Sequence, residues 1–401
     1  MILLLALATL QVCPQCPISS VQEAVAMANA GDTIEVASGH YPEGLVLIDK
    51  PLKLTGEGKP VIDGGNQEHV FYVRADDVTI DGFVIQNSGK SYISEYAGIR
   101  AEESKNCHFT NNTFLNNTYS VYLAKVENCL IEKNEMTGNA KNEVMGGNGV
   151  HLWYSNKIAV RENAIRYHRD GIYIEFSGNS LFANNRSEKN IRYGMHFMYS
   201  NQNKYLNNIF SENQTGVAVM YSKNIEMTGN RFEKSWGNSC YGLLIKTISD
   251  SVIANNVFYA DTIGLFADDS NRNRIEGNLF EANGWAVNML GSTEENTFVG
   301  NDFINNYFDF ATNSKTPLNR LESNYWSSYR GYDLNHDGLG DVAFRPMKTF
   351  SVWISHYPEL VALLGSPVIE FLETAERVFP VLTPQTLQDI APRMQRLTRI
   401  Q

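Results

Sequence analysis

Short runs of alternating apolar and polar residues recur through the middle of the chain. The clearest runs each begin at a glycine and read GVHLW, GIYIE, GMHFM, GVAVM and GLLIK, starting at residues 149, 171, 194, 216 and 242. Alternation with a period of two predicts β-strands that have one buried face and one outward face. Successive runs start 22 to 26 residues apart, which is too short for a pair of helices. The pattern therefore predicts a repeat built from short strands.

An asparagine marks each repeat. It recurs nine times, in eight cases with an apolar residue two places later, at Asn112, Asn134, Asn163, Asn185, Asn208, Asn230, Asn256, Asn278 and Asn301. Asparagine at a fixed place favours a turn, and stacked units of strand and turn are typical of a solenoid. We predict an all-β fold, a right-handed parallel β-helix over residues 18–330, in which these asparagines form an internal ladder.

The position of a side chain relative to the asparagine predicts where it points. Residues 13, 11, 5 and 3 places before the asparagine are mostly apolar and should fill the core. Residues 12 and 10 places before it should point outward. Cys107 and Cys129 both lie five places before an asparagine. We expect them to be stacked, buried thiols rather than a disulfide or a metal site.

The first sixteen residues have the pattern of a signal peptide. Residues 1–10 form an apolar run, MILLLALATL, about half as long as a membrane-spanning helix requires. We therefore predict a signal peptide over residues 1–16, and a mature chain that does not itself span a membrane. Cys13 and Cys16 form a CxxC at the end of this segment, where it is a weak redox or metal motif.

Helical patterns are expected at both ends of the β-helix. Residues 20–30 should form an amphipathic helical cap, opened by Ser20 and Glu23 as a capping box. Residues 346–401 form a C-terminal helical extension, with one apolar stripe that comprises Ile369, Phe371, Leu372, Ala375 and Val378. We expect this extension to be a docking segment, and the alternative is a second cap on the solenoid.

Two outward columns bring together side chains with metal chemistry. The column ten places before the asparagines includes Trp153, Glu175, Met198 and Met220, and the column twelve places before includes His151, Tyr173 and His196. Met198 and Met220 fall on adjacent predicted coils, whose backbones should be about 4.8 Å apart. Thioether sulfur and imidazole nitrogen select Cu(I) over calcium or magnesium. The pattern predicts a Cu(I) site at His196, Met198 and Met220, and the alternative is a hydrophobic surface for a partner.

Two lengthened repeats predict a groove over these columns. The extra residues lie within 134–149 and 230–242, in loops that carry Met145, Trp236 and Cys240. Insertions at one coil position lie on one edge of a solenoid and often mark its binding face. We expect the two loops to wall the groove. The further candidate ligands there are Glu175, His151 and Met145.

An acidic loop follows the last repeat. Residues 331–345 include YDLNHDGLGD, with oxygen donors at Asp333, Asn335, Asp337 and Asp341. Donors at alternate positions beside a glycine resemble the start of a calcium loop, although Phe344 stands where an EF-hand has its glutamate. We predict a Ca²⁺ site here, and the alternative is an acidic turn that caps the solenoid.

Charge and carboxylate content restrict the other functions. The net charge of -11 disfavours nucleic acid as a partner. Parallel β-helices often cleave or epimerise acidic polysaccharides, which requires clustered carboxylates or a basic proton abstractor on one strand face. Only Glu175 is expected in the groove, and residues 168–170 are expected to form a solvated turn. A lyase, an epimerase or a carbohydrate-binding solenoid with Trp153 and Tyr173 outward is the alternative function.

Several motifs resemble the NosD family of periplasmic accessory proteins of nitrous oxide reductase maturation. They are GMHFMYSN, GVAVMYSKN, NYWSSYRGYDLNHDGLGD and the helical tail, so the resemblance covers nearly the whole mature chain. It implies a non-enzymatic periplasmic β-helix, attached to the inner membrane through an ABC transporter with a NosY-like permease and a NosF-like ATPase. It also implies that Cu(I) is received from a NosL-like chaperone and delivered to nitrous oxide reductase. The permease is then the expected docking partner of residues 346–401.

Overall fold

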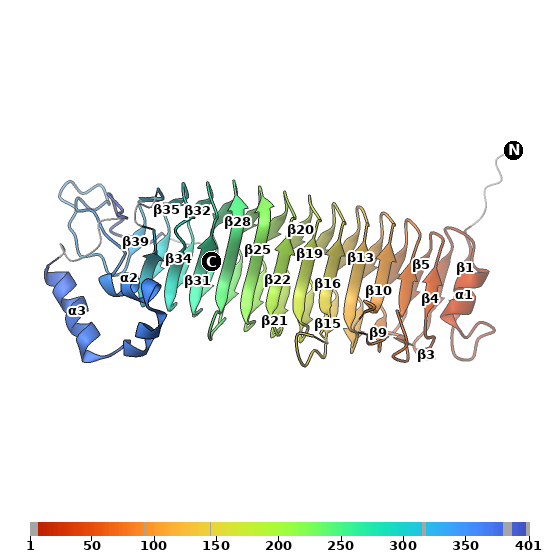
Figure 1. The fold of residues 1–401 in the computed structure, drawn as a ribbon. Coiled ribbons are helices and arrows are strands. Elements are labelled where there is room, and N and C mark those ends of the chain that lie inside the picture. The colour runs from red at the N-terminus through yellow and green to blue at the C-terminus, as the bar shows by residue number, and fades with distance from the viewer. Residues whose placement is uncertain (1–6, 92, 145, 315–317, 380–386, 398–401) are drawn as a thin grey trace. The chain divides into compact units, whose positions relative to one another are not determined.

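The structure is a computed structural model that describes residues 7–91, 93–144, 146–314, 318–379 and 387–397. Within these ranges most of the regular structure is short parallel strands (Figure 1). The chain divides into two compact units, Met1–Ile209 and Phe210–Gln401. Each unit is described by itself.

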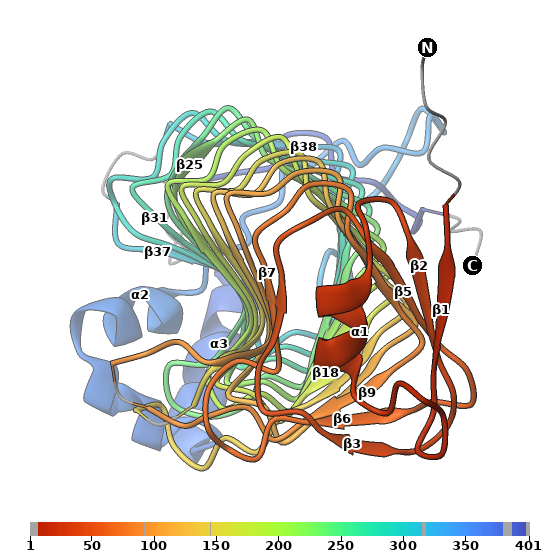
Figure 2. The same cartoon turned by 90° about the vertical axis from the view of Figure 1, so that its right-hand side faces the viewer.

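In the first unit, each regular coil contributes one strand to each of three parallel sheets. The first sheet runs from β1 (Thr9–Val12) to β23 (Lys204–Leu206), and the second runs from β3 (His40–Pro42) to β21 (Arg186–Glu188). The third sheet contains β4 (Val46–Ile48), β7 (Phe71–Val73), β10 (Ala97–Glu102), β13 (Tyr119–Ala124), β16 (Asn148–Trp153), β19 (Asp170–Glu175) and β22 (Tyr193–Met198). In Figure 2 the coils of this unit are seen end on.

The second unit has the same three-sheet arrangement. Its first sheet runs from β26 (Glu226–Thr228) to β38 (Arg320–Glu322), and its second runs from β27 (Arg231–Glu233) to β39 (Tyr325–Trp326). Its third sheet contains β25 (Thr215–Lys223), β28 (Tyr241–Ser249), β31 (Ile263–Asp268), β34 (Trp285–Met289) and β37 (Phe308–Thr312). The predicted all-β parallel β-helix is therefore confirmed.

The predicted asparagine ladder is present inside both units. The backbone N–H of Asn112 donates to Oδ1 of Asn134 at 2.9 Å, and that of Asn230 donates to Oδ1 of Asn256 at 2.8 Å. The side-chain amide of Asn134 in turn donates to the buried carbonyl of Phe109 at 2.9 Å. An amide side chain can both donate and accept a hydrogen bond. It can therefore satisfy the backbone N–H and C=O groups at a turn, which have no partner in a neighbouring strand. This is why asparagine recurs at a buried turn.

The apolar residue two places after each asparagine fills the core. In the second unit these residues form a column of stacked rings with centroids 4.1 to 4.9 Å apart, made of Phe232, Phe258, Phe280, Phe303 and Trp326. Ser187, the one polar residue at this place, is also buried and donates its hydroxyl to the carbonyl of Gly194 at 2.7 Å. A buried hydroxyl is tolerated there because it has this partner.

The two predicted core cysteines are stacked neighbours. Cys107 and Cys129 are both free and buried, and the backbone N–H of Cys107 lies 2.9 Å from Sγ of Cys129. They come from successive coils, one place before strands that pair in parallel. The prediction of buried thiols without a disulfide is confirmed.

The amino-terminal helix α1 (Val21–Met27) covers the first coils (Figure 2). Ser20 accepts a hydrogen bond from the backbone N–H of Glu23 at 3.2 Å, as the capping box predicts. The carboxylate of Glu43 accepts two further hydrogen bonds from the first turn, one of them from the N–H of Val21 at 2.5 Å. The helix is shorter than the predicted 20–30, because the backbone becomes extended at Ala28.

The predicted signal peptide includes a strand of the first sheet. β1 pairs in parallel with β2 (Thr33–Val36), and its Val12 is fully buried. A disulfide joins Cys13 to Cys16 directly after this strand. Removal of residues 1–16 stays a prediction. Among the residues that the structure describes, no helix is long and apolar enough to cross a membrane.

The C-terminal extension begins with α2 (Thr349–His356), the 3₁₀ helix η1 (Pro358–Leu363) and α3 (Pro367–Val378). Phe350, Ile354 and Ile369 are buried together with Phe308 of β37. Ile369 of the predicted stripe therefore packs in the same cluster as the last coil, and docking of the extension stays a prediction. Phe308 lies on the last coil, so no further coil can cover its side chain. The helices supply the apolar contacts that bury it instead.

Asp389 completes the ladder of the second unit. Its Oδ2 accepts hydrogen bonds from the backbone N–H of Asn324 at 2.9 Å and from Nε1 of Trp326 at 3.2 Å. Arg393 donates to the carboxylate of Asp302 at 2.7 Å and to the carbonyl of Ser323 at 2.8 Å. These two residues therefore bind the last coil of the second unit, as the alternative of a second cap would require.

Candidate functional site

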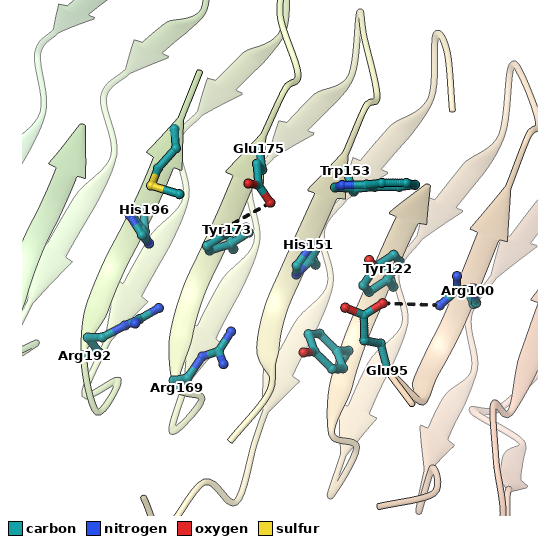
Figure 3. A pocket seen from close by; sticks show the side chains of 12 residues that line it. Glu95, Arg100, Tyr122, His151, Trp153, Arg169, Tyr173, Glu175, Arg192 and His196 are labelled. Carbon is teal, nitrogen blue, oxygen red and sulfur yellow. Dashed lines mark hydrogen bonds and ion pairs between the residues drawn. The ribbon is translucent and has the colours of Figure 1, made fainter. Parts of the chain in front are cut away.

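A groove of about 790 Å³ lies over the third sheet of the first unit (Figure 3). Its lining comes mainly from β10, β13, β16, β19 and β22, with further side chains from the turns before them. The lining residues are Glu95, Arg100, Tyr119, Tyr122, His151, Trp153, Arg169, Tyr173, Glu175, Arg192, His196 and Met198. The predicted outward face of the repeat is therefore the face that carries the groove.

The column twelve places before the asparagines forms the floor of the groove. Tyr122, His151, Tyr173 and His196 are paired across successive strands of the sheet. The ring of His151 stacks between Tyr122, at 4.3 Å between centroids, and Tyr173, at 4.7 Å. The ring of His196 meets Tyr173 edge-on at 5.1 Å. Parallel pairing in register brings identical repeat positions side by side, so one column of the sequence becomes one row of rings.

His196 is a buried imidazole that is 7% exposed. Among the residues that the structure describes, neither its Nδ1 nor its Nε2 has a hydrogen-bond partner. Burial lowers the pKa of His196 to about 4, so the ring is neutral at pH 7 and its unprotonated nitrogen keeps a free lone pair. A buried polar group without a partner is rare in folded proteins, and a bound water or ion is one explanation for it.

Met198 follows on the same strand face and lines the same groove. Glu175 pairs with Met198 across β19 and β22, and Trp153 pairs with Glu175, as the column ten places before the asparagines predicts. The predicted neighbours His196 and Met198 therefore share one site. Met220 lies on β25 in the second unit, paired with Lys246, so its part in the site stays a prediction. Met145 lies outside the described residues.

His151 is less available than His196. Its Nδ1 lies 3.0 Å from the side-chain amide of Asn148, and both ring faces are covered by tyrosines. Burial lowers the pKa of His151 to about 3. A histidine with so low a pKa is a weak base. Burial also raises the pKa of Tyr173, to about 12. Both side chains are therefore held neutral at pH 7.

Two expectations about the groove's charges were wrong. Residues 168–170 are not a solvated turn, because His168 and Asp170 are buried and Arg169 lines the groove. The next coil pairs with this segment, because the N–H groups of Ile191 and Arg192 donate to the carbonyls of His168 and Arg169. The local sequence does not reveal this pairing. Glu175 is also not alone, because Glu95 reaches the groove from the turn before β10 and lies 3.8 Å from Arg100. Sequence reasoning missed Glu95 because its turn lies before the first regular repeat.

The two lengthened loops, within 134–149 and 230–242, were expected to wall the groove, and they lie in different units of the chain. Trp236 is 67% exposed and Cys240 is buried, and both belong to the second unit. In the first unit, the carbonyl of Gly147 at the end of the other loop accepts a hydrogen bond from the N–H of Arg169 at 2.9 Å. This loop therefore helps to hold the turn that presents Arg169 to the groove.

The oxygen atoms of the acidic loop bind the loop's own backbone. The carboxylate of Asp333 accepts hydrogen bonds from the N–H groups of Asp337 and Gly338, and that of Asp341 accepts one from Leu334 at 2.6 Å. No group of three His, Cys, Asp or Glu side chains that could hold a metal ion occurs within the described ranges. The hydrogen bonds are those of an acidic turn, and Ca²⁺ binding stays a prediction.

The fold and the groove together define a class of protein, a parallel β-helix with a groove over the third sheet of its first unit. The A-module of the mannuronan C-5 epimerase AlgE6 from Azotobacter vinelandii has this fold, with a TM-score of 0.63 at 14% identity over 77% of this chain and 93% of that one. The catalytic unit of a GH87 α-1,3-glucanase from Streptomyces thermodiastaticus matches with a TM-score of 0.60 at 13% identity, over 74% and 64%. These likenesses concern the fold alone.

The sequence comparisons give the family. The family described as periplasmic copper-binding protein (NosD) matches residues 30–147 and 140–336. A probable ABC transporter binding protein NosD from Pseudomonas aeruginosa is 33% identical over 378 residues, which cover 90% of this chain and 87% of that protein. Its counterpart from Stutzerimonas stutzeri is 32% identical, over 89% and 85%. The chain belongs to the NosD family of periplasmic copper-binding proteins.

Proposed function

We propose that this chain receives Cu(I) in the groove of its first unit and hands it on for assembly of the copper centres of nitrous oxide reductase. The observation that carries the proposal is the buried imidazole of His196. Its nitrogens have no hydrogen-bond partner within the described ranges, and it lies in the same groove as the thioether of Met198. Copper is the cargo of the protein rather than a resident cofactor. The description of the family as periplasmic and copper-binding supports the proposal.

The two donors suit a monovalent copper ion. Thioether sulfur is a soft ligand, and imidazole nitrogen binds copper through an unprotonated lone pair. The low pKa of His196, about 4, means that protons do not compete for that lone pair near neutral pH. Two donors also leave room in the coordination sphere for a ligand from the protein that gives or takes the ion. Met220 is the third donor that the sequence predicts.

The test is competition for Cu(I) between the purified protein and a coloured Cu(I) chelator. Met198→Leu and His196→Asn should each weaken Cu(I) binding by at least about tenfold, since even loss of an outer-shell partner of a metal site costs that much. Met27→Leu is the matched control, because Met27 is exposed on α1. Wild-type affinity in both groove variants would refute the site, as would tighter binding of Zn(II) than of Cu(I).

We propose the partners that the family resemblance implies. They are a NosY-like permease and a NosF-like ATPase of one ABC transporter, a NosL-like copper chaperone, and nitrous oxide reductase. The printed name of the relatives, ABC transporter binding protein, supports the first of these. The chain would then lie in the periplasm, held at the inner membrane by the transporter, which supplies ATP hydrolysis.

The exposed face of α3 is our proposed contact with the permease. Ile369 faces the last coil, but Val368 is 72% exposed and Phe371 is 76% exposed. Exposed apolar side chains side by side on one helix favour a partner surface. The double variant Val368→Ser, Phe371→Ser should keep the melting temperature and the Cu(I) affinity of the wild type, yet no longer copurify with the transporter. Glu370→Gln is the control, and undiminished copurification of the double variant would rule out this contact.

A further inference from the structure

A row of exposed aromatic side chains borders the groove. It consists of Tyr154, Phe176 and Tyr199, each of which directly follows the last residue of β16, β19 or β22. The exposed fractions of these residues are 48%, 37% and 46%. The ring of Phe176 stacks on that of Tyr154, at 4.7 Å between centroids, and on that of Tyr199, at 5.3 Å. The three rings therefore form one continuous surface, which we call the aromatic ribbon.

The backbone of the ribbon disfavours aromatic residues. The φ angles of Tyr154, Phe176 and Tyr199 are +48°, +50° and +50°, in the left-handed region. Bulky side chains are costly in this region, and glycine, asparagine and aspartate tolerate it best. Asn179 and Asn184 adopt the same conformation at other turns of the unit. Neither backbone preference nor burial in the core accounts for three aromatic rings here, which favours a role at the surface.

The ribbon runs along one edge of the groove. Trp153, Glu175 and Met198 end their strands and line the groove, and each is followed by one ring of the ribbon. Figure 3 shows Trp153 and Glu175 at this end of their strands and Glu95 toward the opposite edge. A segment bound along the ribbon would therefore pass beside the thioether of Met198.

The opposite edge of the groove also exposes apolar side chains. Parallel neighbours in a sheet begin at the same edge, and the segments that lead into β10 and β16 carry Ile93, which is 93% exposed, and Val144, which is 76% exposed. Single exposed apolar side chains need no explanation, but a group of them around a groove marks an interaction site. A protein seated across the groove would cover both edges.

The stacking of the ribbon selects the chemistry of its ligand. Both faces of Phe176 are covered by neighbouring rings, so the exposed part of its ring is the edge. A sugar packs on the open face of an aromatic ring, and Phe176 offers none. The sulfur of a methionine makes favourable contacts with ring edges. The ribbon is therefore better suited to thioether side chains than to a sugar chain.

We infer that the aromatic ribbon docks a methionine-bearing segment of the protein that exchanges copper with this chain. The inference rests on the proposed function for the existence of that partner. A methionine suits both the docking and the transfer, because its side chain packs on ring edges and its sulfur is a soft ligand for Cu(I). A segment docked on the ribbon would bring such a sulfur next to Met198.

The experiment measures peptide binding to metal-free protein by calorimetry. The probe is an end-capped, uncharged peptide of alternating serine and methionine, and its matched control has norleucine in place of methionine, which keeps an unbranched side chain without sulfur. Wild type should bind the methionine peptide about fivefold or more tightly than the norleucine peptide, because several sulfur contacts act together. The triple variant Tyr154→Asn, Phe176→Asn, Tyr199→Asn should weaken binding of the methionine peptide on the order of tenfold or more.

The variants are chosen to keep the fold and the copper site. Asparagine tolerates the left-handed backbone, and none of the three residues is a proposed copper ligand, so the triple variant should bind Cu(I) as the wild type does. Tyr167→Asn is the matched control for the peptide. Tyr167 is 44% exposed and has a φ of +59°, but it follows β18 (Ala164–Arg166) on the second sheet and is not part of the ribbon.

Four results would overturn the inference. They are no measurable binding of the methionine peptide to the wild type at millimolar concentration, equal binding of the methionine and norleucine peptides, wild-type peptide affinity in the triple variant, and tighter binding of a neutral oligosaccharide such as maltohexaose than of the methionine peptide. The peptide test uses metal-free protein and the copper test uses no peptide. Failure of the ribbon and failure of the proposed copper site are therefore distinguishable.

Discussion

Replacing Asp389 by alanine should lower the free energy of unfolding by more than about 3 kcal/mol, because several buried donors lose their acceptor at once and each costs about 1–3 kcal/mol. The donors are the backbone N–H groups of Ser323 and Asn324, the side-chain amide of Asn324 and Nε1 of Trp326. Asp389 is fully buried, so water cannot replace the lost carboxylate. Chemical denaturation followed by circular dichroism measures the change.

Two further variants test whether a loss of stability comes from the lost hydrogen bonds of Asp389 or from any substitution in this segment. Asp389→Asn keeps one oxygen for Asn324 and Trp326 but turns an amide toward Ser323, so its stability should lie between that of alanine and wild type. Ile390→Ala changes a neighbour that is 68% exposed and should be close to neutral. If Asp389→Ala unfolds at the same denaturant concentration as Ile390→Ala, then residues 387–397 are not a structural cap.

Acidification from pH 6 to pH 5 should destabilise the protein by roughly 3 kcal/mol, because its buried histidines stay neutral in the folded state. Burial lowers the pKa of four histidines to between about 3 and about 4, namely His69, His151, His168 and His196. In the unfolded chain they take up protons below about pH 6.5. The unfolded state then binds more protons than the folded state, so stability is complete above that pH and falls as the pH drops toward 4.

Two buried carboxyl groups oppose this trend. Burial raises the pKa of Asp309 to about 6 and also raises that of Asp261, so both bind a proton more readily in the folded state and gain stability on acidification. Four histidines against two aspartates leave a net loss on acidification. Melting temperatures between pH 7 and pH 4.5 test the sign. His168→Gln should flatten the dependence and exposed His108→Gln should not, and a melting temperature that rises on acidification would contradict the prediction.

The sequence alone determined the repeat, the register and the chemistry of the columns. A strand alternates with a period of two and each coil turns at a buried asparagine, so both signals are local. The clearest alternating runs recur five times and the asparagine nine times. Once the register is known, parallel pairing brings equivalent residues side by side. For this reason the sequence predicts His151, Tyr173 and His196 in one outward column, and Cys107 beside Cys129.

The tertiary structure alone decided which charges enter the groove and how the second unit ends. His168 and Asp170 belong to a segment that reads as solvated from the sequence, but both are buried, and Asp170 pairs with Arg192 of the next coil. Asp389 accepts hydrogen bonds from Asn324 across 65 residues, from a segment with no repeat of its own. Contacts of this kind leave no periodic pattern in the sequence. They join residues that are far apart along the chain, and only the folded structure brings those residues together.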